Sequence, residues 1–443
     1  MSRDLNQDMR DEHVAGCDEY HALARRDFLQ IATGVGVAAL LPAWLPQVVL
    51  AQSSNGSRDI IVSIFLSGGT DGMSLVAPFG DPAYYTGRPT IAIPRPDAAG
   101  TGPKGVALDD FFAFSPGMAP LMPAYSTGDL LVAHATGSVD TSRSHFDAQR
   151  YMEVGKPRDP NIAGGWLGRH LATSTPLRSD APLRALGLTS GLPRTLEGAP
   201  RTLPIPNPAN FTIGGSGTTA NARTQWLSQN HQTAPDPVAA NALDSTNTIA
   251  LLQQINFSGY RPANGAVYPP SSFGNALRST AALIKADVGV EAIHAFNGGW
   301  DTHATQGPLP GLDGGFMHNK MLDLSQSLAA FHADVIQGTT SYGVTVVIIS
   351  EFGRNARENG DRGTDHGRGN VAFAMGRKIN GGRVLINGWP GLARENLEAG
   401  QDLRVTLDHR DLLAEIVQNR LGNPNLNVVF PDYTPRFRNI TKP

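Results

Sequence analysis

The sequence predicts an α/β protein in which helices cover both faces of a mostly parallel central sheet. Short apolar runs rich in β-branched residues, which are typical of buried strands, alternate with segments of helical periodicity. The 49 glycines and 32 prolines indicate many turns and long loops between these segments. This alternation favours parallel strands connected by helices that pack on the two faces of the sheet.

The strands are predicted from apolar runs that end at glycine- or serine-rich turns. They comprise residues 59–66, 130–135, 290–296 and 344–349, with two shorter strands at 371–375 and 383–385.

The helices are predicted from apolar residues that recur every three or four positions. They comprise residues 144–153, 277–286, 322–335 and 411–421. The segment 173–270 is rich in Pro, Ser, Thr and Asn and has little regular periodicity. We expect it to form a loop-rich cap insertion over the core, with a few short helices.

The N-terminus predicts export. Arg25 and Arg26 precede an apolar segment, residues 31–50, which ends in small or apolar residues suited to cleavage near Ala51. The paired arginines resemble a twin-arginine signal. A membrane helix is the alternative, but glycines and prolines shorten the apolar run below the ~20 residues needed to span.

We therefore expect residues 1–51 to be a twin-arginine signal peptide, and residues 52–443 to form one periplasmic or secreted domain without a stable membrane span. The twin-arginine export machinery is thus one expected partner.

Composition narrows the chemistry of this domain. Over the whole chain, 36 basic residues are nearly balanced by 39 acidic ones, which argues against a nucleic-acid partner. The only cysteine, Cys17, lies in the predicted signal, so the mature domain offers no thiol nucleophile, disulfide or sulfur ligand. A bound divalent metal must be held by carboxylates and imidazoles, which suits Mg, Ca, Mn or Zn.

Three predicted strands end on a Gly or Ser followed by a carboxylate, namely Asp71, Asp301 and Glu351. In open parallel sheets, ligands bind beyond the carboxyl ends of the strands. Acids from distant parts of the sequence should therefore converge at that edge, and unpaired acids do not converge without a cation.

Histidines and a further acid can join this edge. They are His303, Asp365 and His366, so the predicted metal ligands are Asp71, Asp301, His303, Glu351, Asp365 and His366. Hard acids with imidazoles are typical of a hydrolytic metal site. A solvated turn is the alternative for the Asp365–His366 pair, because Asp and Gly dominate turns.

The loop that carries this pair is expected to fold back toward the strand ends. Glycines at 360, 363, 367 and 369 are expected to supply the left-handed turns for this return. Arg354, Arg357 and Arg362 could bind an anionic substrate, but an exposed loop is the expectation for all three.

Several motifs then occur in a characteristic order. They are LSGGTDGMS from Leu66, DPAYY from Asp81, RSHFDAQ from Arg143, WDTH from Trp300, SEFGR from Ser350 and TDHG from Thr364. As a set they resemble the DUF1501 family of exported bacterial proteins. The similarity runs from about residue 60 to Gly422 and is weakest over 175–270. It implies an alkaline-phosphatase-like fold, related to those of sulfatases and phosphoglycerate mutases.

The resemblance also implies catalytic roles. Ser144, at the start of a helix, matches the attacking hydroxyl, with Ser142 and Thr141 as alternatives. Its neighbours Arg143 and His145 complete the catalytic set; Arg143 could clamp an anion that the helix N-terminus also holds. An ordinary helix N-cap remains the alternative for Ser144, since Asp147 follows three residues later.

The same resemblance implies a metal set of Asp71, Asp301, His303 and His366. Glu351 stands where many relatives carry an Asp–His pair, and Phe352 replaces that histidine, which puts a two-metal site in doubt. There is also no Cys-x-Pro-x-Arg stretch, which disfavours a formylglycine sulfatase.

Three functions follow as hypotheses. The first is an exported metal-dependent hydrolase of phosphate- or sulfate-type esters, or of another small or glycan-type anionic substrate. The second is a metal- or glycan-binding relative without turnover. The third, an exported redox enzyme, is disfavoured because the only partial nucleotide fingerprint, at Gly34, lies in the predicted signal.

Overall fold

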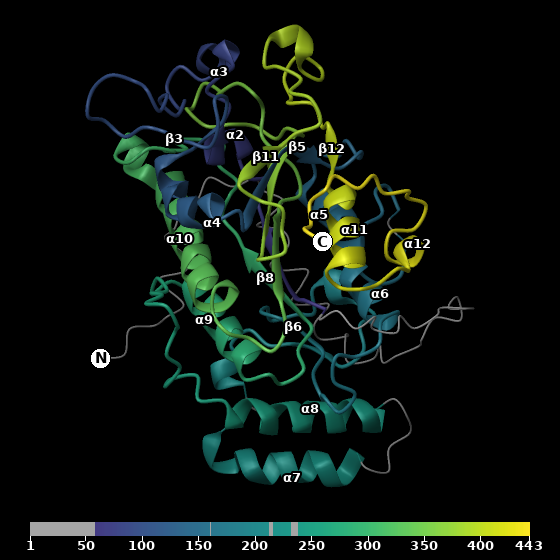
Figure 1. Cartoon of the computed structure of the whole chain (residues 1–443). Helices are drawn as coiled ribbons and strands as arrows, with labels where there is room; N and C mark the ends of the chain where they lie inside the picture. Colours follow the sequence, from purple (N-terminus) through teal and green to yellow (C-terminus); the bar gives the residue numbers. More distant parts are fainter. Residues whose placement is uncertain (1–57, 160, 212–215, 232–237) are drawn as a thin grey trace.

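The computed structural model describes residues 58–443, apart from residues 160, 212–215 and 232–237 (Figure 1). The signal peptide predicted for residues 1–51 lies outside the described residues.

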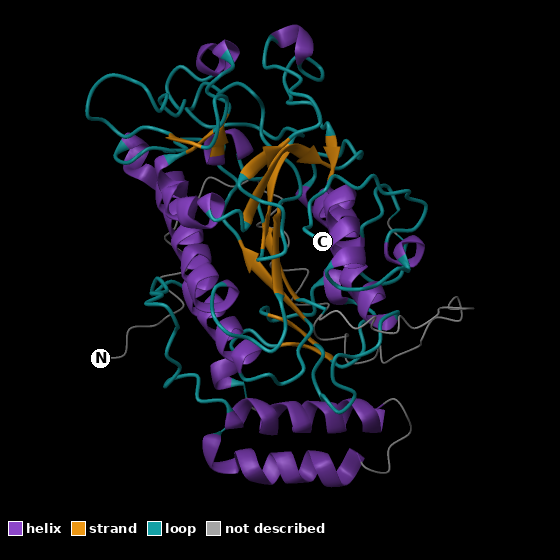
Figure 2. Cartoon of the chain, in the orientation of Figure 1, coloured by secondary structure: helices purple, strands orange, loops and turns teal. Residues whose placement is uncertain are grey.

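A central sheet organises the described chain (Figure 2). Its strands follow the order β11-β5-β10-β9-β1-β8-β6-β7, with β12 paired to β5. They are β1 (Ile60–Leu66), β5 (Leu130–Gly137), β6 (Ala185–Gly187), β7 (Thr202–Pro204), β8 (Ala292–Asn297), β9 (Val344–Ile349), β10 (Asn370–Met375), β11 (Arg383–Leu385) and β12 (Leu407–Asp408). A small second sheet contains β2 (Val76–Ala77), β4 (Ala113–Phe114) and β3 (Val106–Ala107).

The main sheet is mostly parallel, as predicted. β1 pairs in parallel with β8 on one side and β9 on the other. β10 is the exception, because it runs antiparallel to both β9 and β5. The carboxyl ends of β1, β5, β8 and β9 consequently lie along one edge of the sheet.

Helices cover both faces of the sheet (Figure 1). One face carries α4 (Met122–Ser126), α9 (Ser272–Lys285) and α10 (Phe316–Phe331); the other carries α5 (His145–Val154), α6 (Trp166–Ala172), α11 (His409–Asn419) and α12 (Leu426–Val429). The remaining α-helices are α2 (Gly72–Leu75), α3 (Pro82–Gly87), α7 (Ala220–His231) and α8 (Val238–Gln254).

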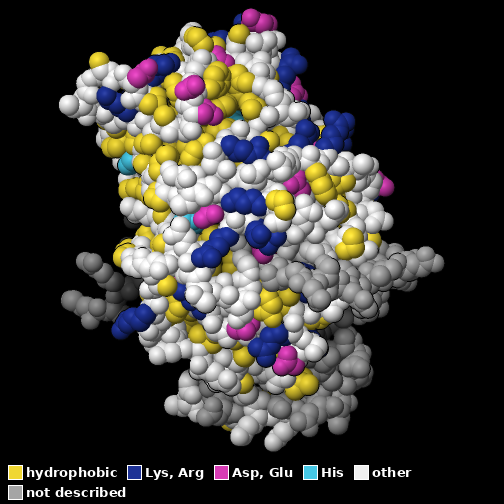
Figure 3. Space-filling model, in the orientation of Figure 1, with side chains coloured by type: hydrophobic (Ala, Val, Ile, Leu, Met, Phe, Trp, Pro, Cys, Tyr) yellow, Lys and Arg dark blue, Asp and Glu magenta, His cyan; other side chains and the backbone are white. Residues whose placement is uncertain are grey.

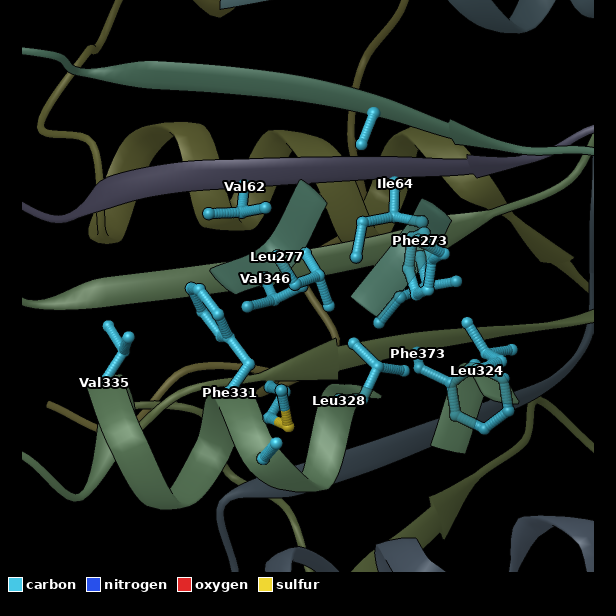
Figure 4. Packing of buried hydrophobic residues seen from close by; sticks show 14 of the residues in the cluster. Val62, Ile64, Phe273, Leu277, Leu324, Leu328, Phe331, Val335, Val346 and Phe373 are labelled. Carbon is cyan, nitrogen blue, oxygen red and sulfur yellow. The ribbon is translucent and has the colours of Figure 1, made fainter. Parts of the chain in front are cut away.

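The two cores follow from the alternation of side chains along a strand. Val62 and Ile64 of β1 face the α9–α10 side, whereas Ile61 and Phe65 face the α6–α11 side. Figure 4 shows Val62 and Ile64 in the first core, where Leu328 of α10 packs among the same apolar side chains. Burial of both faces explains why β1 is apolar at every position except Ser63 instead of alternating.

Three helices begin earlier than predicted, and side-chain caps account for two of these starts. α9 starts at Ser272, since the Ser271 hydroxyl accepts the Gly274 N–H at 2.9 Å. α11 starts at His409, where the Asp408 carboxylate accepts the Arg410 N–H at 2.9 Å. α10 begins at Phe316 and gives way at His332 to a π-helical turn, His332–Ile336.

The segment 173–270 is more regular than predicted. It adds the edge strands β6 and β7 to the main sheet, and its helices α7 and α8 have 12 and 17 residues. In Figure 1 these two helices lie at the opposite end of the molecule from α2, which follows the end of β1. They therefore lie away from the strand ends, and they are longer than the short helices expected for this segment.

The surface carries both signs of charge. On the face drawn in Figure 3, Lys and Arg side chains are interspersed with Asp and Glu. Over the described ranges, no helix combines the length and the apolar character needed to cross a membrane.

Candidate metal centre

Four segments deliver polar side chains to the carboxyl edge of the sheet. Asp301 and His303 follow β8, Glu351 follows β9, and His145 begins α5 after β5. His366 arrives from the loop 353–369, which folds back on itself as predicted. Its two arms pair through Asn355 N–H to Asp365 C=O at 2.9 Å and Gly367 N–H to Gly353 C=O at 2.8 Å.

The glycines of this loop act differently from the prediction. Residues 360, 363, 367 and 369 do not have the positive φ expected of them; Arg362 does, at 58°. Close approach is the reason for two of the glycines. A Cβ on Gly363 would lie 2.2 Å from the His303 carbonyl carbon, and one on Gly367 would lie 2.4 Å from that of Arg354.

Three imidazoles and one carboxylate meet at the strand ends. His366 Nε2 lies 3.0 Å from both His145 Nε2 and His303 Nε2. Asp301 Oδ1 lies 2.9 Å from His303 Nε2, 3.3 Å from His366 Nε2 and 3.6 Å from His145 Nε2. Two atoms bonded to one ion at ~2.0–2.1 Å are roughly 3.0–3.5 Å apart. The ligand atoms of His145, Asp301 and His366 all lie within 4.8 Å of one another, so these three groups fit a shared metal ion, and His303 Nε2 adjoins them beside Asp301 and His366.

The outer nitrogen of each ring is held by an acceptor. His145 Nδ1 lies 2.7 Å from Glu351 Oε1, His303 Nδ1 lies 3.0 Å from Asp365 Oδ1, and His366 Nδ1 lies 2.8 Å from the Arg143 carbonyl. Ionised carboxylates and carbonyls only accept, so each Nδ1 carries the proton and a neutral ring keeps its Nε2 lone pair inward. Metal-binding histidines are oriented in this way.

Electrostatics at this point favour a cation. Burial alone lowers the pKa of His145, but the hydrogen bonds and charges of Asp301 and Glu351 outweigh burial and raise that pKa to about 9. Burial would raise the pKa of Asp301, yet the three histidines and Arg354 hold it well below its usual range. An ionised Asp301 and the raised pKa of His145 both show that positive charge is stabilised at this point, which suits a divalent ion that displaces the proton of His145.

Glu351 lies behind His145 and does not face the common point. It is 2% exposed, and its Oε1 accepts from both His145 and the Gly68 N–H, the latter at 2.8 Å. Its Oε2 accepts the Ser350 hydroxyl at 3.0 Å. The structure thus places Glu351 as an orienting group for an imidazole, where the sequence predicted a ligand. Asp365, also predicted as a ligand, has the equivalent position behind His303.

Asp71 is not brought into this group. Its carboxylate is fully buried and pairs with Arg88, at 2.5 Å to Oδ2 and 2.9 Å to Oδ1. Ser74 and Gln306 donate to Oδ2 as well, at 2.6 and 2.7 Å. Since a buried arginine already neutralises Asp71, this acid needs no metal ion to lie at the strand edge.

Arg354 is fully buried, so the expectation of an exposed loop is wrong for this residue. Its guanidinium donates to the carbonyls of Gly69 at 2.6 Å and Thr364 at 2.9 Å, and to Asp301 Oδ1 at 2.5 Å. It also contacts the Gly68 carbonyl and His303 Nε2. Arg354 joins the turns after β1 and β8 to the folded-back loop, and its engaged donors leave it unsuited to clamp a substrate.

The three residues predicted to be catalytic lie beside the histidines. Ser144 is the N-cap of α5, and its hydroxyl accepts the Asp147 N–H at 3.5 Å, as the capping alternative required. Arg143 binds Asp402 through its guanidinium at 2.5 Å, while its carbonyl holds His366. Ser144 therefore lies between Arg143, whose carbonyl contacts His366, and His145, which is itself one of the three imidazoles.

Phe352 packs beside the imidazoles. Its ring is buried, with its centroid 4.8 Å from that of His145 and 4.9 Å from that of His366. Gly69 permits this packing, because a Cβ there would lie 2.4 Å from the Phe352 ring. The ring supports the imidazoles sterically and offers no lone pair.

Comparison with known proteins identifies the family. The family model of DUF1501, described as a protein of unknown function, matches residues 58–423. The protein belongs to DUF1501. The motifs that indicated this membership supply His145, Asp301, His303, Glu351, Arg354 and His366. No curated protein matches the sequence of this DUF1501 member.

Solved structures resemble the DUF1501 chain distantly. The C-terminal periplasmic domain of EcEptC from Escherichia coli, in complex with Zn, is 11% identical; the match covers 88% of this chain and 92% of that one, with a TM-score of 0.39. An alkaline phosphatase superfamily protein from Vibrio parahaemolyticus is 10% identical over 79% and 67% of the two chains, with a TM-score of 0.30. The alkaline phosphatase of the Antarctic bacterium TAB5 is 11% identical over 72% and 92%, with a TM-score of 0.25.

Proposed function

We propose that this DUF1501 protein is an exported metal-dependent hydrolase of phosphate- or sulfate-type esters or a related anionic substrate, built on an alkaline-phosphatase-like fold. One observation carries the proposal. Three imidazoles, each with its outer nitrogen tied to an acceptor, direct their Nε2 atoms and Asp301 Oδ1 toward one point at the carboxyl edge of the sheet. The predicted signal peptide supports export to the periplasm or beyond.

His145, Asp301 and His366 would hold the ion, with His303 as a further ligand beside Asp301 and His366, while Glu351 and Asp365 orient two of the imidazoles. When bound, a divalent ion polarises a substrate oxygen and lowers the pKa of a hydroxyl toward ~7. Among Zn, Mn, Ca and Mg, a set with three imidazoles suits Zn best.

We propose that the centre holds a single ion. Asp71, the remaining strand-end acid, is neutralised by Arg88, and Phe352 stands where the resemblance placed another histidine. Neither position offers a free ligand for a second ion.

The first turn of α5 supplies the anion-binding part of the site. Backbone N–H groups at a helix N-terminus lack helical acceptors, and the helix dipole favours negative charge there. Because His145 begins this helix, an anion held at the turn lies beside the metal ligands. The Ser144 hydroxyl at the same turn is the proposed attacking group. Arg143 contributes mainly through its carbonyl, since its guanidinium binds Asp402.

Metal analysis combined with ester hydrolysis tests this proposal. The purified protein should hold one divalent ion and should hydrolyse an aryl phosphate or an aryl sulfate. His303→Ala and His366→Ala should each lose the ion and the activity. His318→Ala, at a partly buried histidine of α10, is the matched control. Equal metal content in both site variants and the parent would overturn the proposed centre.

One observation favours a second function. Four side chains gather here, and a metal site with four protein ligands is typically structural, because catalytic sites keep an open position. A metal-binding relative without turnover is therefore the second candidate. Retention of one ion, without hydrolysis of either ester, would identify it.

A further inference from the structure

Two adjoining cavities lie far from the candidate metal centre. Their volumes are about 430 and 630 Å³, and both are lined by Gln254, Ile255 and Asn256, where α8 ends. Residues of α9 line both cavities, and Asn207 and Asn210 complete the larger one. Figure 1 shows α8 at the opposite end of the molecule from α2, so this site is independent of the proposed hydrolytic centre.

Exposed side-chain amides make up half of the lining of the larger cavity. They belong to Asn207, Asn210, Gln253, Gln254, Asn256 and Asn275. Within the described chain, the amides of Asn210, Gln253 and Asn275 make no hydrogen bond to protein, so their donors and acceptors are available to a ligand. An amide presents both a carbonyl acceptor and two N–H donors. A hydroxyl group, which also donates and accepts, matches such a wall.

A guanidinium adds a positive charge to this wall. Arg278 is half-buried and donates one N–H to the Tyr260 carbonyl at 3.0 Å, which fixes the side chain while leaving other donors for a ligand. Neither cavity has an Asp or Glu in its described lining. A sulfate or carboxylate substituent can therefore pair with Arg278 without competition from an acid in the wall.

The smaller cavity differs in having an apolar wall. Leu251, Ile255 and Val288 line it, and Tyr260 lies across from Lys285, whose ammonium is 5.6 Å from the ring centroid. Lys285 is itself paired with Asp334, so its charge is largely neutralised. This cavity suits the C–H face of a ring rather than a second anionic group.

We propose that the two cavities form a binding site for a sulfated oligosaccharide. One sugar unit places its hydroxyls on the amides of the larger cavity and its sulfate on Arg278. The neighbouring unit packs its C–H face against the smaller cavity. The site anchors a sugar chain and carries out no chemistry on it.

Fluorescence anisotropy with a labelled sulfated tetrasaccharide and its desulfated counterpart tests this site on the full chain. Arg278→Gln should weaken binding of the sulfated probe about tenfold, as expected for loss of one charged hydrogen bond, and should leave the desulfated probe unaffected. The double variant Gln253→Ala, Asn275→Ala should weaken binding of both probes. Arg261→Gln, at an exposed arginine outside both cavities, is the control and should change neither.

Three results would overturn the proposal. The first is that Arg278→Gln binds the sulfated probe as tightly as the parent does. The second is that Arg261→Gln loses as much affinity for the sulfated probe as Arg278→Gln does, because an equal loss indicates charge attraction alone. The third is loss of binding in excess EDTA, which places the probe at the metal centre. Binding that survives EDTA supports the site even if the hydrolase proposal fails.

Discussion

At the scale of single residues, hydrogen bonds behind the imidazoles decide the candidate centre. Glu351→Gln tests this. A glutamine oxygen can still accept from His145 Nδ1 and from Gly68, but the negative charge behind the imidazole is lost. Removal of such an orienting group lowers metal affinity by about 10–100-fold. Zinc titration against a chromophoric chelator measures the change, with the exposed Glu395→Gln as control. Unchanged affinity would show that Glu351 serves only the fold.

Ser144 has two roles to separate, the cap of α5 and the proposed attacking hydroxyl. Asn is as good an N-cap as Ser but carries no hydroxyl. Ser144→Asn should therefore keep the melting temperature while abolishing ester hydrolysis, whereas Ser144→Ala should also lose about 1 kcal/mol of stability. If Ser144→Asn keeps full activity, the attacking group is not this hydroxyl.

Glu153 of α5 should make stability depend on pH. It is 6% exposed, and burial raises its pKa to about 8 against weaker effects of Gln149 and Arg194. A carboxyl whose pKa is raised in the folded state contributes stability that is complete below its unfolded pKa of ~4.3 and is lost as the pH rises toward the folded value.

The stability of Glu153→Gln relative to that of the parent should therefore increase as the pH rises from 5 to 8.5. Thermal unfolding at these two pH values measures the difference, and we expect a relative gain of about 3 °C or more at the higher pH. A constant difference between variant and parent would indicate that Glu153 does not titrate in this window.

At the scale of elements, Arg354 connects the turns after β1 and β8 with the folded-back loop. Arg354→Lys keeps the charge but cannot donate to Gly69, Thr364 and Asp301 together, because an ammonium lacks the planar fork. Each hydrogen bond of the charged guanidinium that is lost costs about 1.5–3 kcal/mol. Urea unfolding in EDTA measures the free energy of unfolding without metal. This free energy should fall in Arg354→Lys and should be unchanged in Arg357→Lys, at an exposed arginine. Equal stability of the two variants would refute the connecting role.

At the scale of the whole molecule, the proposed export depends on the predicted twin-arginine signal. Replacing Arg25 and Arg26 with lysines should leave the precursor in the cytoplasm, because the twin-arginine pathway reads the pair itself and not its charge. Arg10→Lys in the same predicted signal is the matched control. Fractionation followed by immunoblotting locates the protein, and normal export of the double-lysine variant would contradict the predicted route.

Local patterns in the sequence determined much of this protein. The apolar runs predicted the principal strands, since burial of both faces of a sheet requires them, and β9 has the predicted bounds. The motifs after the strands predicted that Asp301, His303 and His366 would meet, because parallel strands end at a common edge. Family membership followed from the same motifs.

Only the tertiary structure decided which partner each polar side chain takes. Asp71 and Asp301 follow equivalent strands, yet one pairs with Arg88 and the other faces three imidazoles. Glu351 lies behind His145, 206 residues away in sequence, and Arg354 is buried among the carbonyls of Gly69, Trp300 and Thr364, which belong to three separate segments. A strand's apolar pattern is a local property, whereas the partner of a buried charge depends on which distant groups the packed chain brings within hydrogen-bonding distance.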